Sequence, residues 1–315
     1  MIQRFARWLG GVALHWFYSD VRVTGADHIP LHGPILIAMN HQNALVDAIL
    51  ALWIVPRRLR LTAKATLGDN IFGALLMKAV GIIPLHRTSD EPISQDRIRN
   101  RRSFEVIIEE LRCGGAVLVF PEGKSHNDSE IAPLKTGLAR AALWAREAGV
   151  QGIRIVPVGI TFENKAEPNT AVLARIAEPI MVDNWSGESA RELTEAIAEM
   201  LRVIALTGEI SPNRDWVPGR RNAFVQLAAA WGRLMHEIPL RFARREAIRL
   251  SADAGEPAMY TMTLGLAAII VSYLIEVPIV WLLFGWTIGL IFLASLVTGA
   301  YWAAYADHSP VRSPH

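Results

Sequence analysis

The sequence predicts an α/β protein in which a central sheet is flanked by helices and followed by a membrane-seeking segment. Short apolar runs alternate with helical patterns through most of the first 206 residues. Polar side chains gather where several of these apolar runs end. The chain has 32 Lys and Arg and 30 Asp and Glu, yet residues 257–306 contain only one charged side chain, that of Glu276.

The short apolar runs are expected as strands, because polar or glycine-containing segments bound them. The expected strands are residues 34–38, 59–63, 82–85, 116–120, 153–160 and 172–182. Helices are expected at residues 103–112, 134–147 and 190–206. In the first of these helices Phe104, Ile107 and Leu111 share one face, and two glycines after the helix supply its stop signal.

The C-terminal segment, residues 257–306, is long enough for two membrane crossings. As a helix it would extend roughly 75 Å, whereas the hydrocarbon core of a bilayer is about 30 Å thick. Gly285 divides it into two expected spans near residues 260–282 and 286–305. Arginines lie on both sides of this hairpin: Arg241, Arg244, Arg245, Arg249 and Arg312. Their charge places both ends of the hairpin, and the domain before it, on the cytoplasmic face of the inner membrane. A pair of buried core helices is the alternative.

Residues 1–20 show an amphipathic pattern with apolar and aromatic side chains on one helical face. That face contains Ile2, Phe5, Leu9, Val12, Ala13, Trp16 and Phe17. Arg4 and Arg7 lie off it, as in a helix at a bilayer surface, while packing on the protein's own core is the alternative. We therefore expect an interfacial helix at 1–20, a domain at 21–256 and a transmembrane hairpin at 257–306.

The composition argues against several classes of protein. A net charge of +2 does not supply the concentrated basic field of a nucleic-acid-binding protein. The single cysteine, Cys113, excludes an intrachain disulfide and is expected to be buried. The nine histidines lack metal-ligand spacing, so neither a metal ion nor another cofactor is expected.

Four short segments hold reactive or turn-forming residues where an expected strand ends. They are residues 40–47 (NHQNALVD), 81–87 (GIIPLHR), 120–126 (FPEGKSH) and 156–159 (VPVG). Because ligands bind at the carboxyl ends of strands in open α/β sheets, these segments are expected to converge on one crevice. Gly123-Lys124-Ser125 imitates the end of a phosphate-binding P-loop, but that loop requires glycine where Leu118 stands.

In this order the four segments resemble the motifs of the glycerophospholipid acyltransferases, the PlsC-type family that acylates glycerol 3-phosphate and lysophosphatidate. The resemblance extends from about residue 29 to residue 182 and implies a mixed central sheet flanked by helices. Five residues separate His41 from Asp47, where most members have four, although a variant with five resembles part of the family. Lys124-Ser125 stands where the common motif has Thr-Arg, so the motif arginine is missing.

The resemblance implies that an alcohol attacks an acyl thioester with the help of His41 and Asp47. A neutral histidine takes the proton of the attacking hydroxyl, which contributes roughly 10²–10⁴ in rate. A carboxylate on the other ring nitrogen fixes the tautomer and stabilises the imidazolium. Because these two positions would not share a face on a straight helix, the extra residue must be absorbed in the turn between strand and helix. No covalent acyl-enzyme is expected.

Fixed positive charge is needed to bind the phosphate of the acceptor. Arg87 is the first candidate, and Lys124 or Lys135 is expected to replace the missing arginine. By resemblance Glu122 helps to hold the glycerol end of the acceptor, while a carboxylate that caps a helix N-terminus is its structural alternative. Gly123 is expected to let the backbone approach the ligand closely.

The resemblance also implies the partners. The donor is acyl-CoA or acyl-acyl carrier protein, and the acceptor is glycerol 3-phosphate or a lysophospholipid, with a slight preference for glycerol 3-phosphate from the His–Asp spacing and the third motif. Membrane lipids are expected partners, and nucleic acids are not. Another lysolipid or an amine as acceptor, or a non-catalytic lipid-binding protein on the same shell, remains open.

Overall fold

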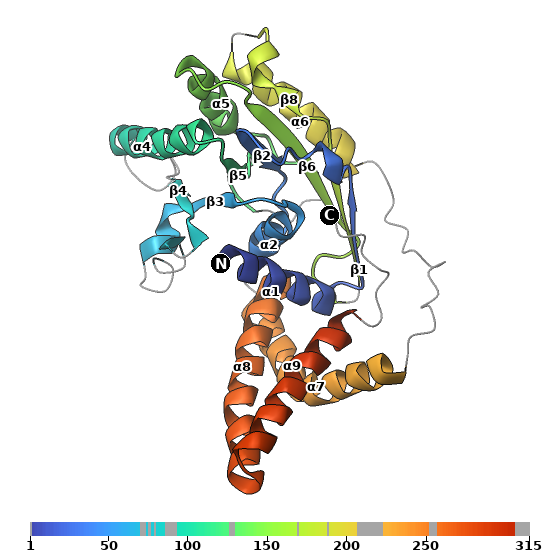
Figure 1. Cartoon of the computed structure of the whole chain (residues 1–315). Coiled ribbons are helices and arrows are strands. Elements are labelled where there is room, and N and C mark those ends of the chain that lie inside the picture. The colour runs from blue at the N-terminus through green and yellow to red at the C-terminus, as the bar shows by residue number, and fades with distance from the viewer. Residues whose placement is uncertain are drawn as a thin grey trace.

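The computed structural model describes residues 2–69, 74, 77–78, 80–85, 93–125, 130–168, 170–187, 189–206, 223–251 and 257–305. Figure 1 shows a sheet with helices packed around it and a pair of long helices projecting from one end. The mixed central sheet with flanking helices that the sequence predicts is confirmed.

The sheet has eight strands in the described part of the chain, in the order β1-β7-β6-β2-β5-β3-β4, and β8 pairs with β6. The strands are β1 (Asp20–Thr24), β2 (Ile35–Met39), β3 (Leu59–Lys64), β4 (Ile83–Leu85), β5 (Ala116–Val119), β6 (Arg154–Phe162), β7 (Ala171–Ile176) and β8 (Ile180–Met181). The central strand β2 is parallel to β5 on one side and to β6 on the other. β6 pairs antiparallel with β7 and β8, which makes the sheet mixed.

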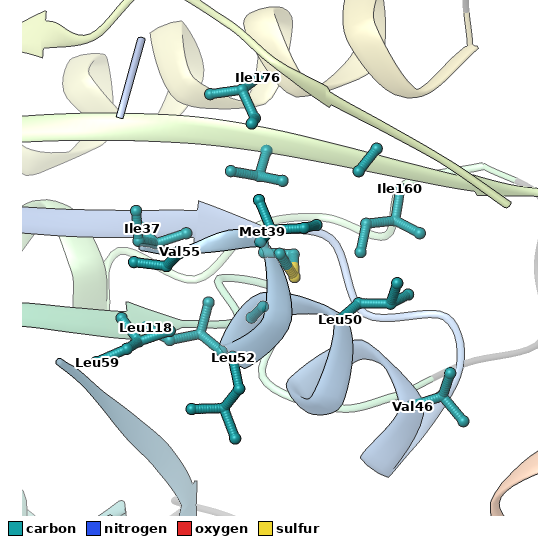
Figure 2. Packing of buried hydrophobic residues seen from close by; sticks show 14 of the residues in the cluster. Ile37, Met39, Val46, Leu50, Leu52, Val55, Leu59, Leu118, Ile160 and Ile176 are labelled. Carbon is teal, nitrogen blue, oxygen red and sulfur yellow. The ribbon is translucent and has the colours of Figure 1, made fainter. Parts of the chain in front are cut away.

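Helices cover both faces of the sheet. One face carries α1 (Ile2–Phe17) and α2 (Ala44–Ile54), and the other carries α4 (Ile93–Arg112), α5 (Gly137–Glu147) and α6 (Ala190–Leu206). Alternate residues of β2 belong to the two cores: Ile37 packs with α2, as Figure 2 shows, and Leu36 packs with the helices of the other face. Every residue of β2 is buried, as in central strands that are covered on both faces.

Five of the expected strands begin and end within two residues of their predicted limits. The sixth, residues 172–182, is instead two strands, β7 and β8, because Pro179 between them cannot donate to a ladder. α4 begins at Ile93, before the predicted residue 103, and Cys113 after its end is exposed rather than buried. β1 and the long helix α7 (Ala223–Ser251) are additional to the expected elements.

Two C-terminal helices, α8 (Pro257–Phe284) and α9 (Trp286–Tyr305), are long and apolar enough to cross a membrane, judged by length and composition. Gly285 joins them with a φ of +90°, which glycine adopts without strain. Large apolar side chains on both helices are exposed, and Leu282 reaches 85%. The expected pair of apolar helices is therefore present, and its exposure does not fit the alternative of buried core helices.

α1 combines the two arrangements expected for the N-terminus. Leu14 and Phe17 are buried in the core that α2 also covers. Phe5 and Trp8 are 61% and 46% exposed, so part of the apolar surface of α1 is free of the domain. Contact with a bilayer through these aromatic side chains stays a prediction.

Candidate active site

His41 and Asp47 meet where β2 ends and α2 begins. The Nδ1 atom of His41 lies 3.0 Å from Oδ2 of Asp47. The side chain of Asp47 is fully buried, whereas the imidazole is 15% exposed. The ring is therefore the part of this pair that a ligand can reach, with the carboxylate behind it.

The turn between β2 and α2 absorbs the five residues that separate this pair. Ala44, the first residue of α2, has a φ of +40°, a value that residues with a Cβ atom rarely adopt. The backbone N–H of Asn43 donates to the same Oδ2 atom of Asp47 at 2.7 Å. Asp47 thus holds the turn as well as the ring. Its other oxygen, Oδ1, is buried and has no hydrogen-bond partner among the described residues.

Asn40 joins the end of β2 to β6. Its side-chain oxygen accepts the N–H of Ile160 at 2.6 Å, and its amide donates to the carbonyl of the same residue at 2.9 Å. The fourth motif, residues 156–159, lies inside β6 and not at a strand end, because β6 continues to Phe162. A Cβ atom built on Gly159 would lie 2.7 Å from Cγ1 of Ile204, so this glycine lets α6 pack closely on the strand.

Glu122 connects the loop after β5 to the backbone of His41. Its side chain is buried, at 2% exposure. Oε1 accepts the backbone N–H of His41 at 2.6 Å, and Oε2 accepts the backbone N–H of Ala132 at 2.8 Å. The carboxylate therefore caps backbone N–H groups, as in the structural alternative, although these groups belong to two loops and not to a helix N-terminus.

The third motif also contacts the first through Phe120 and Ser125. The ring of Phe120 stacks on the imidazole of His41, with centroids 3.9 Å apart and planes inclined by 13°. The hydroxyl of Ser125 accepts the backbone N–H of Ala44 at 3.1 Å. The first and third motifs consequently form one unit around His41.

A polar network from outside the motifs supports the turn. The amide of the buried Asn43 donates to the hydroxyl of Tyr18 at 3.0 Å and to the carbonyl of Lys165 at 3.1 Å. The ammonium of Lys165 donates to the carbonyl of Gln42 at 2.7 Å. Burial, together with the charge of Asp47, raises the pKa of Tyr18 well above its usual value, so the phenol stays neutral. Tyr18 and Lys165 lie 25 and 122 residues from Asn43 in the chain, and no motif identifies them.

Of the three basic residues expected to bind phosphate, the structure describes Lys124 and Lys135 but not Arg87. Arg87 lies outside the described residues, and the strand before it, β4, is three strand positions from β2, or about 14 Å by the usual spacing. Lys124 and Lys135 are exposed at the third motif, where the N–H of Lys135 donates to the carbonyl of Pro121 at 2.7 Å. Gly123 has a φ of +77° in this loop, so its conformation alone accounts for glycine there.

The arrangement is suited to proton transfer. A buried carboxylate behind a partly exposed imidazole can orient the ring and stabilise its protonated form. Within the described ranges, no three His, Cys, Asp or Glu side chains are grouped so that they could hold a metal ion. An imidazole held in this way can act as a general base.

The chain is similar to known acyltransferases in sequence. Residues 20–161 match the family model described as Acyltransferase. The chain is 30% identical over 111 residues to glycerol-3-phosphate O-acyltransferase 2 of Saccharomyces cerevisiae, covering 35% of this chain but only 15% of the yeast protein. It is 24% identical over 180 residues to 1-acyl-sn-glycerol-3-phosphate acyltransferase of Haemophilus influenzae, covering 55% of this chain and 69% of that protein.

A solved structure shares the fold. The crystal structure of the 1-acyl-sn-glycerophosphate (LPA) acyltransferase PlsC from Thermotoga maritima superposes with a TM-score of 0.51 at 25% identity, and the match covers 64% of this chain and 76% of that one. The family model contains the strand, turn and helix that hold His41 and Asp47, and the third motif as well. The match to the Acyltransferase family thus covers residues 20–161, a little under half of the chain, and includes both motifs around His41.

Proposed function

We propose that this chain is a membrane-bound O-acyltransferase that transfers a fatty acyl group from an acyl thioester to a glycerol phosphate acceptor. The proposed acceptors are glycerol 3-phosphate and 1-acyl-glycerol 3-phosphate, and the donors are acyl-CoA or acyl-acyl carrier protein. The observation that carries the proposal is the 3.0 Å contact between Nδ1 of His41 and the buried Asp47. The names of the yeast and bacterial relatives support the same chemistry.

In the proposed reaction His41 is the general base. Asp47 keeps a proton on Nδ1, so Nε2 accepts the proton of the acceptor hydroxyl. The hydroxyl oxygen forms the new bond to the thioester carbonyl carbon, the C–S bond breaks, and the leaving thiolate takes the proton from His41. Stacking on Phe120 and the hydrogen bond to Glu122 keep the histidine in place during this transfer.

The acceptor's phosphate requires cationic partners near the third motif. We assign this role to Arg87, Lys124 and Lys135, of which the two lysines are exposed beside the motif loop. Glu122 and Gly123 shape the acceptor side of the site, Glu122 through its bond to the backbone of His41. In the same proposal α8 and α9 hold the catalytic domain on the cytoplasmic face of the membrane.

Thiol release from acyl-CoA tests the proposal with the full chain purified in detergent. Glycerol 3-phosphate and 1-acyl-glycerol 3-phosphate are compared with glycerol, which lacks the phosphate. We expect release that requires a phosphate-bearing acceptor and falls at least about 100-fold in His41→Ala. His32→Ala is the matched control, because this exposed histidine precedes β2 at the opposite end from the site.

Other results of this assay would change or contradict the proposed function. Release that requires a different lysolipid or an amine would keep the chemistry and change the acceptor. If no thiol is released from acyl-CoA, the assay is repeated with acyl-acyl carrier protein as the donor. If no thiol is released with either donor, or if His41→Ala reacts at the wild-type rate, the proposed enzyme activity is contradicted. Such a result would favour a non-catalytic lipid-binding protein with an acyltransferase fold.

A further inference from the structure

α7 crosses the C-terminal hairpin at a distance from the turn at Gly285. A Cβ atom built on Gly232 would lie 1.9 Å from the carbonyl oxygen of Gly299 in α9, so the two backbones touch. On α8, the hydroxyl of Tyr273 lies 2.7 Å from Nε2 of the buried His236. Figure 1 shows α7 at an angle to the hairpin, with the turn projecting beyond it.

Outside this packed face, α7 exposes a stripe of large apolar side chains. The stripe residues recur every three or four positions: Phe224, Leu227, Trp231, Leu234, Ile238 and Phe242. Ile238 is 80% exposed and Leu227 is 71% exposed. A continuous stripe of this kind exceeds the scattered apolar residues of ordinary surfaces and marks an interaction surface.

One edge of α7, between the packed face and the stripe, is charged. Arg233, Glu237 and Arg241 are exposed along this edge, and Glu237 lies 2.6 Å from Arg241. Ala230 is exposed on the same edge, by the periodicity of the helix. Over residues 224–242, α7 therefore has a wide apolar surface and a narrow arginine-bearing edge, as is typical of helices that lie in a bilayer surface.

The other edge of α7 faces the turn of the hairpin. Ala228 of this edge, together with the stripe residues Phe224, Leu227 and Trp231, lines an open cleft of about 390 Å³ against Ala294 and Ser295 of α9. Both of these α9 residues lie between Gly299 and the turn, so this edge points toward the turn. The charged edge therefore points away from it.

We propose that α7 lies in the plane of the membrane surface, and that the hairpin enters the bilayer at that level and turns inside the hydrocarbon without crossing it. The stripe and the turn-facing edge contact lipid acyl chains, while the arginine edge reaches headgroups and water. The stripe joins the exposed apolar surface of α9 through Trp231, whose ring centroid lies 6.4 Å from that of Phe292, and this continuity makes lipid its occupant.

The number of residues beyond the crossing sets the depth of the hairpin. Gly285 follows Tyr273 by twelve residues and precedes Gly299 by fourteen. At 1.5 Å per residue the turn lies roughly 18–21 Å beyond α7, which is less than the ~30 Å hydrocarbon core. A full crossing would carry Arg233 and Arg241 into the hydrocarbon, where charged side chains are strongly disfavoured.

α1 meets the hairpin at the same level. The indole N–H of Trp16 donates to the carbonyl of Ala300 at 3.0 Å, and β1 of the water-facing domain begins at Asp20. The domain therefore limits deeper insertion of the hairpin. A full crossing would instead place Trp281 and Trp286, which flank the turn, at the far surface, where tryptophan is enriched. The two arrangements thus differ in the environment of the turn.

Labelling of the full chain in phosphatidylcholine and phosphatidylglycerol nanodiscs distinguishes them, because both disc faces are open to water. The exposed Cys113 is the positive control for a charged, membrane-impermeant maleimide. In a Cys113→Ser background the single replacements are Thr287→Cys beside the turn, Ile238→Cys in the stripe and Ala230→Cys on the charged edge. We expect Ala230→Cys to label as fast as Cys113 and the other two at least tenfold more slowly, with full labelling after denaturation in SDS.

Lipids with nitroxide groups provide a second readout. A fluorophore at Ile238→Cys is expected to be quenched best by a nitroxide near the headgroup end of the acyl chain, and one at Thr287→Cys by a nitroxide near the chain terminus. Rapid aqueous labelling of Thr287→Cys in discs would overturn the one-sided hairpin. Labelling of Ile238→Cys like that of Ala230→Cys, or protection without quenching by either lipid, would overturn the lipid-facing position of α7.

Discussion

The hydroxyl of Ser125 accepts a 3.1 Å hydrogen bond from the backbone N–H of Ala44, the residue with a φ of +40° at the start of α2. This bond connects the two departures from the common acyltransferase motifs. Ala44 lies in the turn that accommodates five residues between His41 and Asp47, and Ser125 stands where the common third motif has arginine. The longer turn and the serine therefore meet at one contact.

Ser125→Ala is expected to lower kcat about 2- to 12-fold and to leave the KM of the acceptor nearly unchanged. The loss of one neutral hydrogen bond, about 0.5–1.5 kcal/mol, loosens the turn without removing a substrate contact. Steady-state kinetics measure both constants, and Ser125→Thr, which keeps the hydroxyl, is the matched control. A raised KM with an unchanged kcat would show that Ser125 contacts the substrate instead.

Glu122→Gln is expected to lower both stability and kcat. The substitution replaces one accepting oxygen with an NH₂ group that faces a backbone N–H, so a buried donor loses its partner at a cost of about 1–3 kcal/mol. Chemical unfolding in detergent and steady-state kinetics measure the two effects. If stability stayed at the wild-type level while the acceptor KM rose, Glu122 would act on the acceptor directly.

The raised pKa of Tyr18 predicts a loss of stability in alkali. Above about pH 10 the unfolded chain releases the phenol proton while the folded protein keeps it, so the free energy of unfolding falls as pH rises. Tyr18→Phe should remove this part of the fall. Unfolding at about pH 8 and about pH 11 measures it, and an equal dependence on pH in the two proteins would contradict the burial of a neutral phenol.

Arg57 is expected to stabilise the end of the sheet away from the site. Its guanidinium donates to the carbonyls of Pro30, Gly33 and Gly114, in the loops before β2 and β5. Arg57→Ala should lower the free energy of unfolding by about 1–3 kcal/mol and leave the kcat of the folded protein unchanged. The exposed neighbour supplies the control, Arg58→Ala. Equal stability of the two variants would show that these carbonyls do not depend on Arg57.

Much of the fold follows from local sequence patterns, and the exceptions have physical causes. β2 and β5 are continuous apolar runs, so their limits are predicted closely. The large apolar residues of α7 recur every three or four positions, a spacing typical of a helix. That spacing does not show that the apolar stripe is exposed while small residues such as Ala229 and Gly232 form the packed face.

The candidate site is predictable only where its residues lie in one motif. The spacing of His41 and Asp47 indicates their contact, once the turn is assumed to absorb the extra residue. Tyr18 and Lys165 hold the turn between β2 and α2 only because distant parts of the chain meet in three dimensions. The residues around them in the sequence form no motif that would indicate this role. Glu122 is visible in its motif, but only the fold shows that it holds the backbone of His41.

The central claim is that His41 and Asp47 act as one proton-transfer unit, and a double-mutant cycle tests it most directly. The kcat/KM of the wild type is compared with those of His41→Ala, Asp47→Asn and the variant that carries both. We predict that each single change lowers kcat/KM at least about 100-fold, and that the double variant is no worse than His41→Ala within a few-fold, because Asp47 acts through the imidazole. Fully additive losses, or near wild-type activity in His41→Ala, would contradict the account.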